Sequence, residues 1–374
     1  MLFIGYLGVT LRVSDDKNVK IEFLIVGQGL AGSLLAWRLI QLGRSVLVVD
    51  PCLEQTASRT AAGLINPITG KRLVKTVNVE RYLPEATALY DELGVFFDRP
   101  FLHAIAQVRL FKSTDEVAQW EKRHTQRDYA PFLGRRFAAK ERPEFSNNSR
   151  GGFEQKHCGY LDTVSLLDQL REFFVDKGCF VKGRVDLNGL VDDGLPIHWQ
   201  GYTVDKLVFC DGYQLQNNHW FSWLPLQAVQ GEIFTLKTDQ PLPKQMVQFG
   251  KWLLPLGQGR FKLGATWQWT PLDMKPTNKG ERELFDACYK HFPNFQTAQL
   301  IEKKVGIRPG TRDRLPFLGS HPHVKRLAVF NGFGSKGSLM IPWYADCFAR
   351  YLTSGDPLPA SVDIKRYVDD CPTR

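Results

Sequence analysis

Apolar and polar positions near the start of the chain follow two different spacings in quick succession. Residues 21–26 are a short apolar run, a glycine-rich turn occupies 27–32, apolar residues at helical spacing fill 34–40, and a second apolar run covers 46–49. Short apolar runs bounded by turns are typical of buried strands, and the helical spacing between them predicts a crossover helix. Residues 21–50 therefore predict a strand, a glycine turn, a helix and a second strand that ends at Asp50.

The rest of the chain alternates between this pattern of strands and helices and a second pattern of antiparallel strands. Helices are predicted at 79–93, around 115–124 and from about 161 to 176, the third capped by Asp162 or Thr163, with buried strands at 106–111, 179–181 and 206–210. Residues 224–270 change to alternating strands with glycine turns and include a hairpin of 252–256 with 261–267. The last segment repeats the first pattern, with a strand at 327–330, a glycine loop and a helix from 338.

This order predicts an α/β fold in which a Rossmann-like nucleotide-binding domain, built from separated segments, carries an inserted antiparallel-sheet domain. The expected nucleotide-binding segments are 20–78, 152–213 and 306–374, and the inserted segments are 79–151 and 214–305. Residues 1–19 begin apolar but lack a basic leader and turn polar before a membrane span is complete. We expect an extension ahead of a natural start near Val19; a small extra strand is the alternative.

The glycine turn carries a specific chemical expectation. Gly27 permits the tight turn, Gly29 lets a pyrophosphate approach the backbone, and Gly32 lets the helix pack closely on the strand, while the helix N-terminus presents N–H groups to the anion. Asp50 then accepts hydrogen bonds from a ribose diol, which disfavours a 2′-phosphate. The unit predicts a dinucleotide site.

Composition and charge narrow the class of protein. A chain of 374 residues with 43% hydrophobic content is long enough for two domains, and seven scattered cysteines without a Cys-x-x-Cys pair predict a reducing compartment, the cytoplasm. The formal net charge of +9 comes from dispersed residues, which indicates a solvated basic surface that attracts anionic partners. His321 and His323 lack an acid or cysteine at ligand spacing, so no metal is predicted. The loop 333–337 lacks the first glycine of a hydrolase nucleophile elbow.

Three further motifs follow the glycine unit in order: Ser-Arg-Thr-Ala-Ala-Gly-Leu-Ile at 58–65, Gly-Ile-Arg-Pro-Gly-Thr-Arg-Asp-Arg-Leu-Pro-Phe-Leu-Gly at 306–319, and Asn-Gly-Phe-Gly-Ser-Lys-Gly at 331–337. With these motifs, residues 20–366 resemble the flavin-dependent amine and amino-acid oxidases typified by D-amino-acid oxidase, glycine oxidase and sarcosine oxidase. The resemblance implies FAD, with its ADP half on the first unit and its isoalloxazine between the two domains. Gly306 stands where sarcosine oxidases carry the cysteine that bonds to flavin, so noncovalent FAD, released by acid or heat, is expected.

The resemblance also implies which residues bind the cofactor. The small residues 61–63 let the backbone approach the flavin ring, and the loop 332–337 precedes a helix whose positive end faces the flavin pyrimidine oxygens, reinforced by Lys336. The full set expected to bind FAD is Gly27, Gly29, Leu30, Ala31, Gly32, Asp50, Ser58, Ala61, Ala62, Gly63, Leu64, Asp211, Gly212, Gly334, Ser335, Lys336 and Gly337.

Two residues are expected to act in catalysis. In glycine oxidase and its relatives the arginine of the motif resembling 306–313 binds the substrate carboxylate, which gives this role to Arg308, and a guanidinium fork suits two parallel charged hydrogen bonds. Strand alternation over 261–269 places Lys262 on one face with Gly264, Thr266 and Gln268. A lysine in a similar strand of sarcosine oxidase lies beside flavin N5 and promotes the reaction with oxygen, because a cation there stabilises negative charge.

The implied activity is oxidation of the C–N bond of a small carboxylate-bearing amine or amino acid by hydride transfer to flavin N5, with oxygen or a quinone as electron acceptor. One alternative keeps the chemistry and changes the substrate: the terminal loop also resembles the oxidoreductase half of the bifunctional enzyme that removes a glycine-derived group from a wobble uridine of tRNA. There, Arg308 would hold the carboxymethyl group and the basic surface would meet phosphates. A flavin-binding protein without turnover is a third hypothesis. Trp252, Trp267 and Trp269 either line a pocket or belong to the core.

Overall fold

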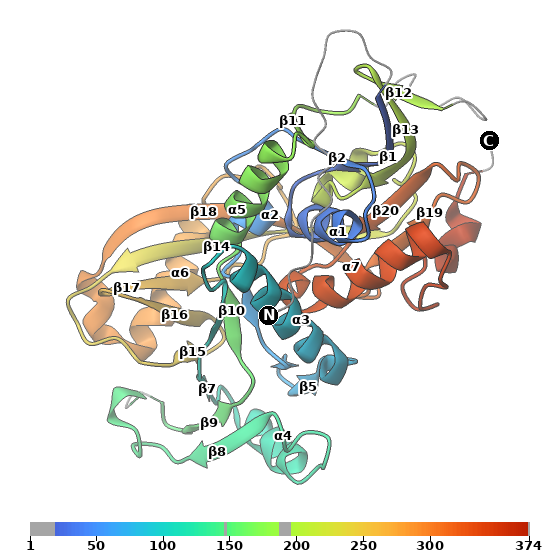
Figure 1. Ribbon diagram of the computed structural model, residues 1–374. Coiled ribbons are helices and arrows are strands. Elements are labelled where there is room, and N and C mark those ends of the chain that lie inside the picture. The colour runs from blue at the N-terminus through green and yellow to red at the C-terminus, as the bar shows by residue number, and fades with distance from the viewer. Residues whose placement is uncertain (1–18, 146–147, 187–195, 373–374) are drawn as a thin grey trace.

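The computed structural model describes residues 19–145, 148–186 and 196–372, and its strands form two large sheets with helices between and around them (Figure 1). The first strand begins at Val19, so the expected extension lies, apart from that residue, outside the described part of the chain. The α/β class with a Rossmann-like sheet and an antiparallel-rich second sheet is confirmed.

The first sheet has seven strands in the order β11-β2-β1-β13-β20-β19, with β12 paired to β13. Its bounds are β1 Val19–Val26, β2 Val46–Asp50, β11 Phe180–Lys182, β12 Ile197–Trp199, β13 Tyr202–Phe209, β19 Phe317–Ser320 and β20 Leu327–Asn331. The pairs β1–β2, β1–β13, β2–β11 and β13–β20 are parallel. Because parallel strands carry side chains buried on both faces, these segments are almost continuously apolar.

Three helices cover one face of this sheet, a fourth, α3, packs on α7, and the C-terminal helix lies next to the first one (Figure 1). They are α1 Leu30–Gln41, α3 Val79–Phe96, α5 Thr163–Asp176 and α7 Gly337–Ser354. The hydroxyls of Tyr82 and Tyr344 are 2.8 Å apart, and the hydroxyl of Tyr90 donates to the carbonyl of Ser338, which ties α3 to α7. The predicted cap of α5 is confirmed, because the Asp162 carboxylate accepts the N–H of Ser165.

The second sheet has eight strands in the order β18-β14-β17-β16-β15-β7-β9-β8. Its bounds are β7 Gln107–Leu110, β8 Leu133–Phe137, β9 Gly152–Gln155, β14 Leu226–Lys237, β15 Met246–Gln248, β16 Trp252–Gly257, β17 Arg260–Gly264 and β18 Gln299–Thr311. Helix α6, Asn278–His291, packs on one face. The long antiparallel pair β14–β18 forms the edge nearest the first sheet (Figure 1).

Short elements connect the sheets and the longer helices. They are α2 Ala57–Thr60, α4 Thr114–His124, β3 Leu64–Ile65, β4 Ile68–Thr69, β5 Val74–Lys75, β6 Leu102–Ala104 and β10 Gly159–Leu161, together with the 3₁₀ helices η1 Pro143–Phe145, η2 Gly212–Asn217, η3 Pro293–Thr297 and η4 Ile364–Asp370. Strands β3, β10 and β6 form a small antiparallel sheet.

The structure differs from the sequence prediction in three places. Strand β9 pairs with β7 and β8 in the eight-stranded sheet, although residue 152 was expected to open a nucleotide-binding segment, and β18 stays in that sheet through Thr311 rather than leaving it at 306. The predicted strand over 261–269 ends at Gly264, so its alternation does not extend to Thr266 and Gln268. Beyond Gly264 the Thr266 hydroxyl, not a ladder carbonyl, accepts the N–H of Glu232.

Candidate active site

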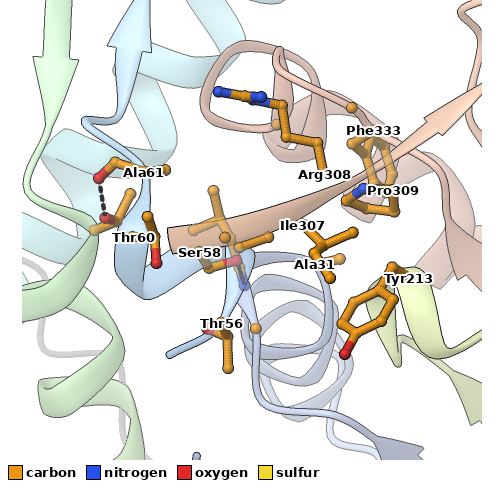
Figure 2. A pocket seen from close by; sticks show the side chains of 18 of the residues that line it. Ala31, Thr56, Ser58, Thr60, Ala61, Tyr213, Ile307, Arg308, Pro309 and Phe333 are labelled. Carbon is orange, nitrogen blue, oxygen red and sulfur yellow. Dashed lines mark hydrogen bonds between the residues drawn. The ribbon is translucent and has the colours of Figure 1, made fainter. Parts of the chain in front are cut away.

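A cavity of about 1000 Å³ runs from the glycine turn of the first sheet to the inner face of the second sheet (Figure 2). Of the residues expected to bind the cofactor, all except Gly32 line it. Arg308 lines it as well, whereas Lys262 does not. In Figure 2, Arg308 is drawn in the upper part of the view and Tyr213 at the lower right, and the lining residues come from both large sheets.

The glycine turn has the geometry that the motif predicts. Gly27 has a φ of 104°, and a Cβ there would lie 2.6 Å from the carbonyl oxygen of Cys210. A Cβ on Gly32 would lie 1.9 Å from the carbonyl oxygen of Gly27, so only glycine lets α1 pack on β1. Beside Gly29 the nearest atom is the Ser58 Oγ at 3.3 Å, which leaves room for a ligand to approach the backbone.

Two helix N-termini face the cavity. Leu30 and Ala31 at the start of α1 line it, as do Lys336 and Gly337 at the start of α7. The first turn of a helix has N–H groups without intrahelical acceptors and carries partial positive charge, which suits an anion. Ser58 Oγ accepts the N–H of Leu30 at 3.0 Å and thereby fixes the turn.

The acidic residues of the nucleotide end are held by main-chain groups or amides. The Asp50 carboxylate accepts the N–H groups of Gln28 and Cys52, both at 2.7 Å, which fixes its orientation at the cavity wall. Asp211, two residues beyond β13, is half-buried, and desolvation raises its pKa to about 7 even though the side-chain amide of Asn331 donates to it at 2.9 Å. Burial disfavours the charged carboxylate, since water no longer solvates it.

Lys336 is the charged residue of the terminal loop. Its amine donates to the hydroxyl of Thr76 at 3.0 Å, and burial together with the positive charge of Arg314 lowers its pKa. The neighbouring Gly334 N–H donates to the Pro309 carbonyl at 3.0 Å. The strand that carries Arg308 is therefore bonded directly to the loop that begins α7.

Arg308 lies at the far end of the cavity with its guanidinium between a backbone and an aromatic ring. Its Cζ is 5.0 Å from the ring centroid of Trp267, and a Cβ on Gly231 would lie 2.3 Å from both terminal nitrogens. Within the described residues, the guanidinium makes one hydrogen bond, a long contact of 3.5 Å to the Thr266 carbonyl. Desolvation lowers its pKa to about 10, and no acidic side chain in the described part of the chain offsets this effect.

The small residues 61–63 form the wall opposite the second sheet. The Ala61 carbonyl accepts the Thr163 hydroxyl at 3.4 Å, drawn as the dashed line in Figure 2. Thr60 contacts Gly306: a Cβ at 306 would lie 2.9 Å from the Thr60 Cβ, and the Thr60 hydroxyl donates to the Val305 carbonyl. A cysteine at 306 would collide with Thr60, which agrees with a cofactor held without a covalent bond at this position.

Lys262 lies beside the cavity without lining it. In the ladder it faces Leu254 on β16, whose side chain packs with Ala62 and Ile233 behind the cavity wall. Burial and the positive charge of Lys304 lower the pKa of the Lys262 amine. The structure thus places a half-buried amine beside a residue that packs on the cavity wall.

Several lining residues carried no clear signal in the sequence. Trp252 and Trp267 line the cavity, which decides between pocket and core for these two, whereas Trp269 is exposed beside them. Gly231 sits inside the twelve-residue strand β14, and an isolated glycine in a strand is a known mark of close approach by another group.

His321 is buried, and its Nδ1 accepts the N–H groups of His323 and Val324, so this ring has a structural task.

These features define a dinucleotide-binding protein with a second, cationic pocket at the far end of its cofactor cavity. The residues present fit FAD in particular, since the cavity is extended, both helix N-termini face it, and Gly29 leaves the backbone accessible. The chain belongs to the family described as FAD dependent oxidoreductase, whose model matches residues 22–351. FAD is its cofactor.

Individual relatives are distant. The chain is 27% identical over 353 residues to the bifunctional protein ThiO/ThiG of Synechocystis sp., covering 86% of this chain and 50% of that protein. It is 22% identical over 418 residues to the tRNA 5-methylaminomethyl-2-thiouridine biosynthesis bifunctional protein MnmC of Leptospira interrogans, covering 96% of this chain and 61% of that protein. The chain therefore spans only about half to three fifths of the length of these two relatives.

The fold agrees with a solved glycine oxidase. The crystal structure of glycine oxidase from Bacillus cereus superposes with a TM-score of 0.78 at 17% identity, covering 95% of this chain and 99% of that one. Among the helices of the described residues, none combines the length and apolar character that crossing a membrane requires.

Proposed function

We propose that this protein oxidises the C–N bond of a small amine or amino acid that carries a carboxylate. The observation that carries the proposal is the guanidinium of Arg308, which is half-buried and desolvated, lines the cavity and has no acidic partner among the described residues. A buried cation is costly unless an anion pairs with it. A substrate carboxylate supplies that anion and gains two parallel charged hydrogen bonds.

The chain's own residues contribute position and charge. When bound, FAD supplies the two-electron acceptor for the substrate C–H bond. Arg308 fixes the carboxylate, Trp267 covers the guanidinium and excludes water from it, and Gly231 leaves the space in which it lies. Holding the reacting carbon in one orientation converts binding energy into rate. The oxidised imine then hydrolyses to a carbonyl compound and an amine or ammonia.

The electron acceptor in this proposal is oxygen, with a quinone as the alternative. The half-buried amine of Lys262 supports the choice of oxygen, since a cation close to a reduced cofactor stabilises the negative charge formed in that reaction. We also propose a noncovalent cofactor, because Thr60 fills the space beside Gly306. The supernatant of acid-precipitated protein is then yellow and the pellet colourless. The seven free thiols fit the reducing cytoplasm proposed as its location.

Replacing Arg308 by alanine tests the proposal directly. We expect kcat/KM for carboxylate-bearing amines to fall about 1,000-fold, the loss of two charge-assisted hydrogen bonds, and far less for amines without a carboxylate. The measurement is anaerobic bleaching of the flavin by a panel of amino acids and matched simple amines. Arg308→Lys is the matched variant, which keeps the charge but loses the fork and recovers only part of the rate. Equal losses for both classes of amine would contradict the assignment.

A second candidate substrate is a carboxymethylaminomethyl-type uridine in tRNA. The match to MnmC over 96% of this chain and the net charge of +9 favour it. In that case Arg308 holds the carboxymethyl group while the basic surface contacts phosphates. Binding of unmodified and modified tRNA should weaken steeply as salt rises, since each phosphate contact releases counterions. Absence of tRNA binding at low salt would remove this candidate and leave the first.

A further inference from the structure

Away from Arg308, three uncharged polar side chains line the cavity, and we call them the polar cluster. They are Asn66 and Thr69, which follow the small residues 61–63, and Gln248 on β15, and each is half-buried. Within the described residues, the Thr69 hydroxyl and the Gln248 side-chain amide make no hydrogen bond. Polar groups that line a cavity without a protein partner are available to a ligand.

Ile68 and Gln155 fix the direction in which the Asn66 amide points. The Asn66 Oδ1 accepts the N–H of Ile68 at 3.2 Å and a hydrogen bond from the amide nitrogen of Gln155. That nitrogen also donates to the Ile68 carbonyl at 3.2 Å, so main-chain groups identify the oxygen of one amide and the nitrogen of the other. The Asn66 Nδ2 has no acceptor in the described part of the chain, which leaves a fixed N–H donor at the cavity wall.

The strand register brings Gln248 next to this segment. Gln248 on β15 pairs with Arg109 on β7, and paired residues on neighbouring strands point to the same face of a sheet. On that face the Arg109 guanidinium donates to the carbonyl of Gly70 at 2.7 Å, and Gly70 directly follows Thr69. Gln248 and Thr69 therefore belong to the same part of the cavity wall.

The polar cluster is electrically neutral. The buried charge beside it, Arg109, is paired with the buried Glu116 at 3.1 Å. The amine of Lys112 approaches Gly250, but Lys112 is exposed to solvent, which screens its charge. Neutral donors and acceptors favour an uncharged ligand group, because a carboxylate at the cluster would lose hydration without gaining a counterion.

An apolar surface lies between the polar cluster and Arg308. Trp252 pairs with Gln248 on one side and with Gly264 on the other, and its indole lies over Gly264, where a Cβ would be 2.4 Å from Cζ2. The order β15-β16-β17-β14 puts three strand spacings, about 14 Å, between the main chains of Gln248 and Gly231, and the Arg308 guanidinium lies over Gly231. Because side chains project into this gap from both ends, a short methylene arm along the indole extends from Arg308 toward Gln248.

We infer that the polar cluster binds a carboxamide at the end of an aliphatic side chain of the substrate. The inference rests on the proposed function, because it takes Arg308 as the anchor of the substrate carboxylate. A carboxamide offers two N–H donors and one acceptor oxygen, which match the oxygens of Gln248 and Thr69 and the N–H donor of Asn66. The preferred substrates are then amino acids with a side-chain amide.

The test compares three amino acids of nearly equal length, each as the D and the L enantiomer, with the FAD-loaded enzyme. Glutamine carries the carboxamide, glutamate is its charged isostere, and norleucine has an apolar side chain. We expect kcat/KM for the better enantiomer of glutamine to exceed the values for norleucine and glutamate about 100-fold, because those compounds leave the polar cluster without its hydrogen bonds.

Two variants assign this preference to the polar cluster. Gln248→Leu removes one amide, and Thr69→Val removes the hydroxyl at constant size. The ratio of glutamine to norleucine should fall about tenfold in the first variant and by a smaller factor in the second. Gln240→Leu, in the loop after β14, replaces an exposed glutamine and should keep the wild-type ratio. A wild-type ratio in both Gln248→Leu and Thr69→Val would overturn the inference.

Dissociation constants separate this inference from the proposed function. Titration of the flavin absorption spectrum under anaerobic conditions measures binding whether or not a compound is oxidised. If no compound reduces the flavin but glutamine binds at least about tenfold more tightly than norleucine, the oxidation proposal fails and the inference stands. If both are oxidised and bound alike, the proposed function stands and the inference fails, and it also fails if neither binds. Retained yellow colour shows that each variant has folded.

Discussion

The two ends of the cavity are built from different parts of the chain. The nucleotide end is built mainly from backbone: a glycine turn, two helix N-termini and one carboxylate, Asp50, fixed by main-chain N–H groups. The end that we propose binds the substrate is built from side chains, with Arg308 between Gly231 and Trp267. Backbone recognition suits an invariant cofactor, whereas side chains allow specificity to change without rebuilding the fold.

The largest effect is expected from a side chain placed inside the backbone end. Gly32→Val puts a branched side chain where a Cβ already lies 1.9 Å from the Gly27 carbonyl, so α1 must move away from β1. We expect insoluble or colourless protein, measured as FAD content after purification. Gly29→Ala is the matched variant: its Cβ has only the Ser58 hydroxyl at 3.3 Å, so the chain should fold but bind FAD about tenfold more weakly. A fully yellow Gly32→Val protein would show that the close packing is unnecessary.

The second-largest effect is expected from replacing Lys262, the amine beside the cavity. If Lys262 acts in the reaction with oxygen, Lys262→Met should slow reoxidation of the reduced enzyme about 100-fold. Reduction of the variant by the amine should stay much faster than its reoxidation. Stopped-flow absorbance of the two half-reactions measures this. Lys304→Met removes a neighbouring charge from β18 and serves as the control. Equal slowing of reoxidation in both variants would assign the effect to general charge rather than to Lys262.

A smaller effect is expected from the strand beneath Arg308. Gly231→Ala places a Cβ 2.3 Å from the guanidinium nitrogens, which must shift by about 1 Å. We expect KM for carboxylate-bearing amines to rise about tenfold with FAD content unchanged. Thr235→Val, on the same strand but away from Arg308, is the control. An unchanged KM would mean that Arg308 does not anchor the substrate in this position.

The smallest effect is a pH dependence located at the nucleotide end. The pKa of Asp211 is raised from 3.8 to about 7, so the folded protein keeps a proton that the unfolded chain releases. Its contribution to stability therefore declines as pH rises from about 4 to about 7, and Asp211→Asn should remove this part of the decline. The free energy of unfolding should fall between about pH 5 and about pH 8 in the wild type, and this fall should be smaller by about 1–3 kcal/mol in the variant. Thermal unfolding at the two pH values measures it. Parallel pH curves for the two proteins would contradict the shift.

The sequence predicted the nucleotide end better than the substrate end, for a physical reason. The glycine unit, Asp50 and the loop before α7 act through local backbone geometry, which short motifs specify, and the structure places nearly all of them around one cavity. The space for Arg308 depends on the register of β14 against β18, which brings Val229 opposite Arg308 and leaves Gly231 under its guanidinium. Such pairing between distant strands leaves no periodic signal in the sequence.

The hydrogen bond from Gly334 to the Pro309 carbonyl has a consequence for engineering this enzyme. It joins the residue next to Arg308, the proposed carboxylate anchor, to the loop that starts the C-terminal helix. Mutations that move β18 in order to widen the pocket around Arg308 will therefore also shift the loop that begins α7. Redesign toward bulkier amines should spare this strand.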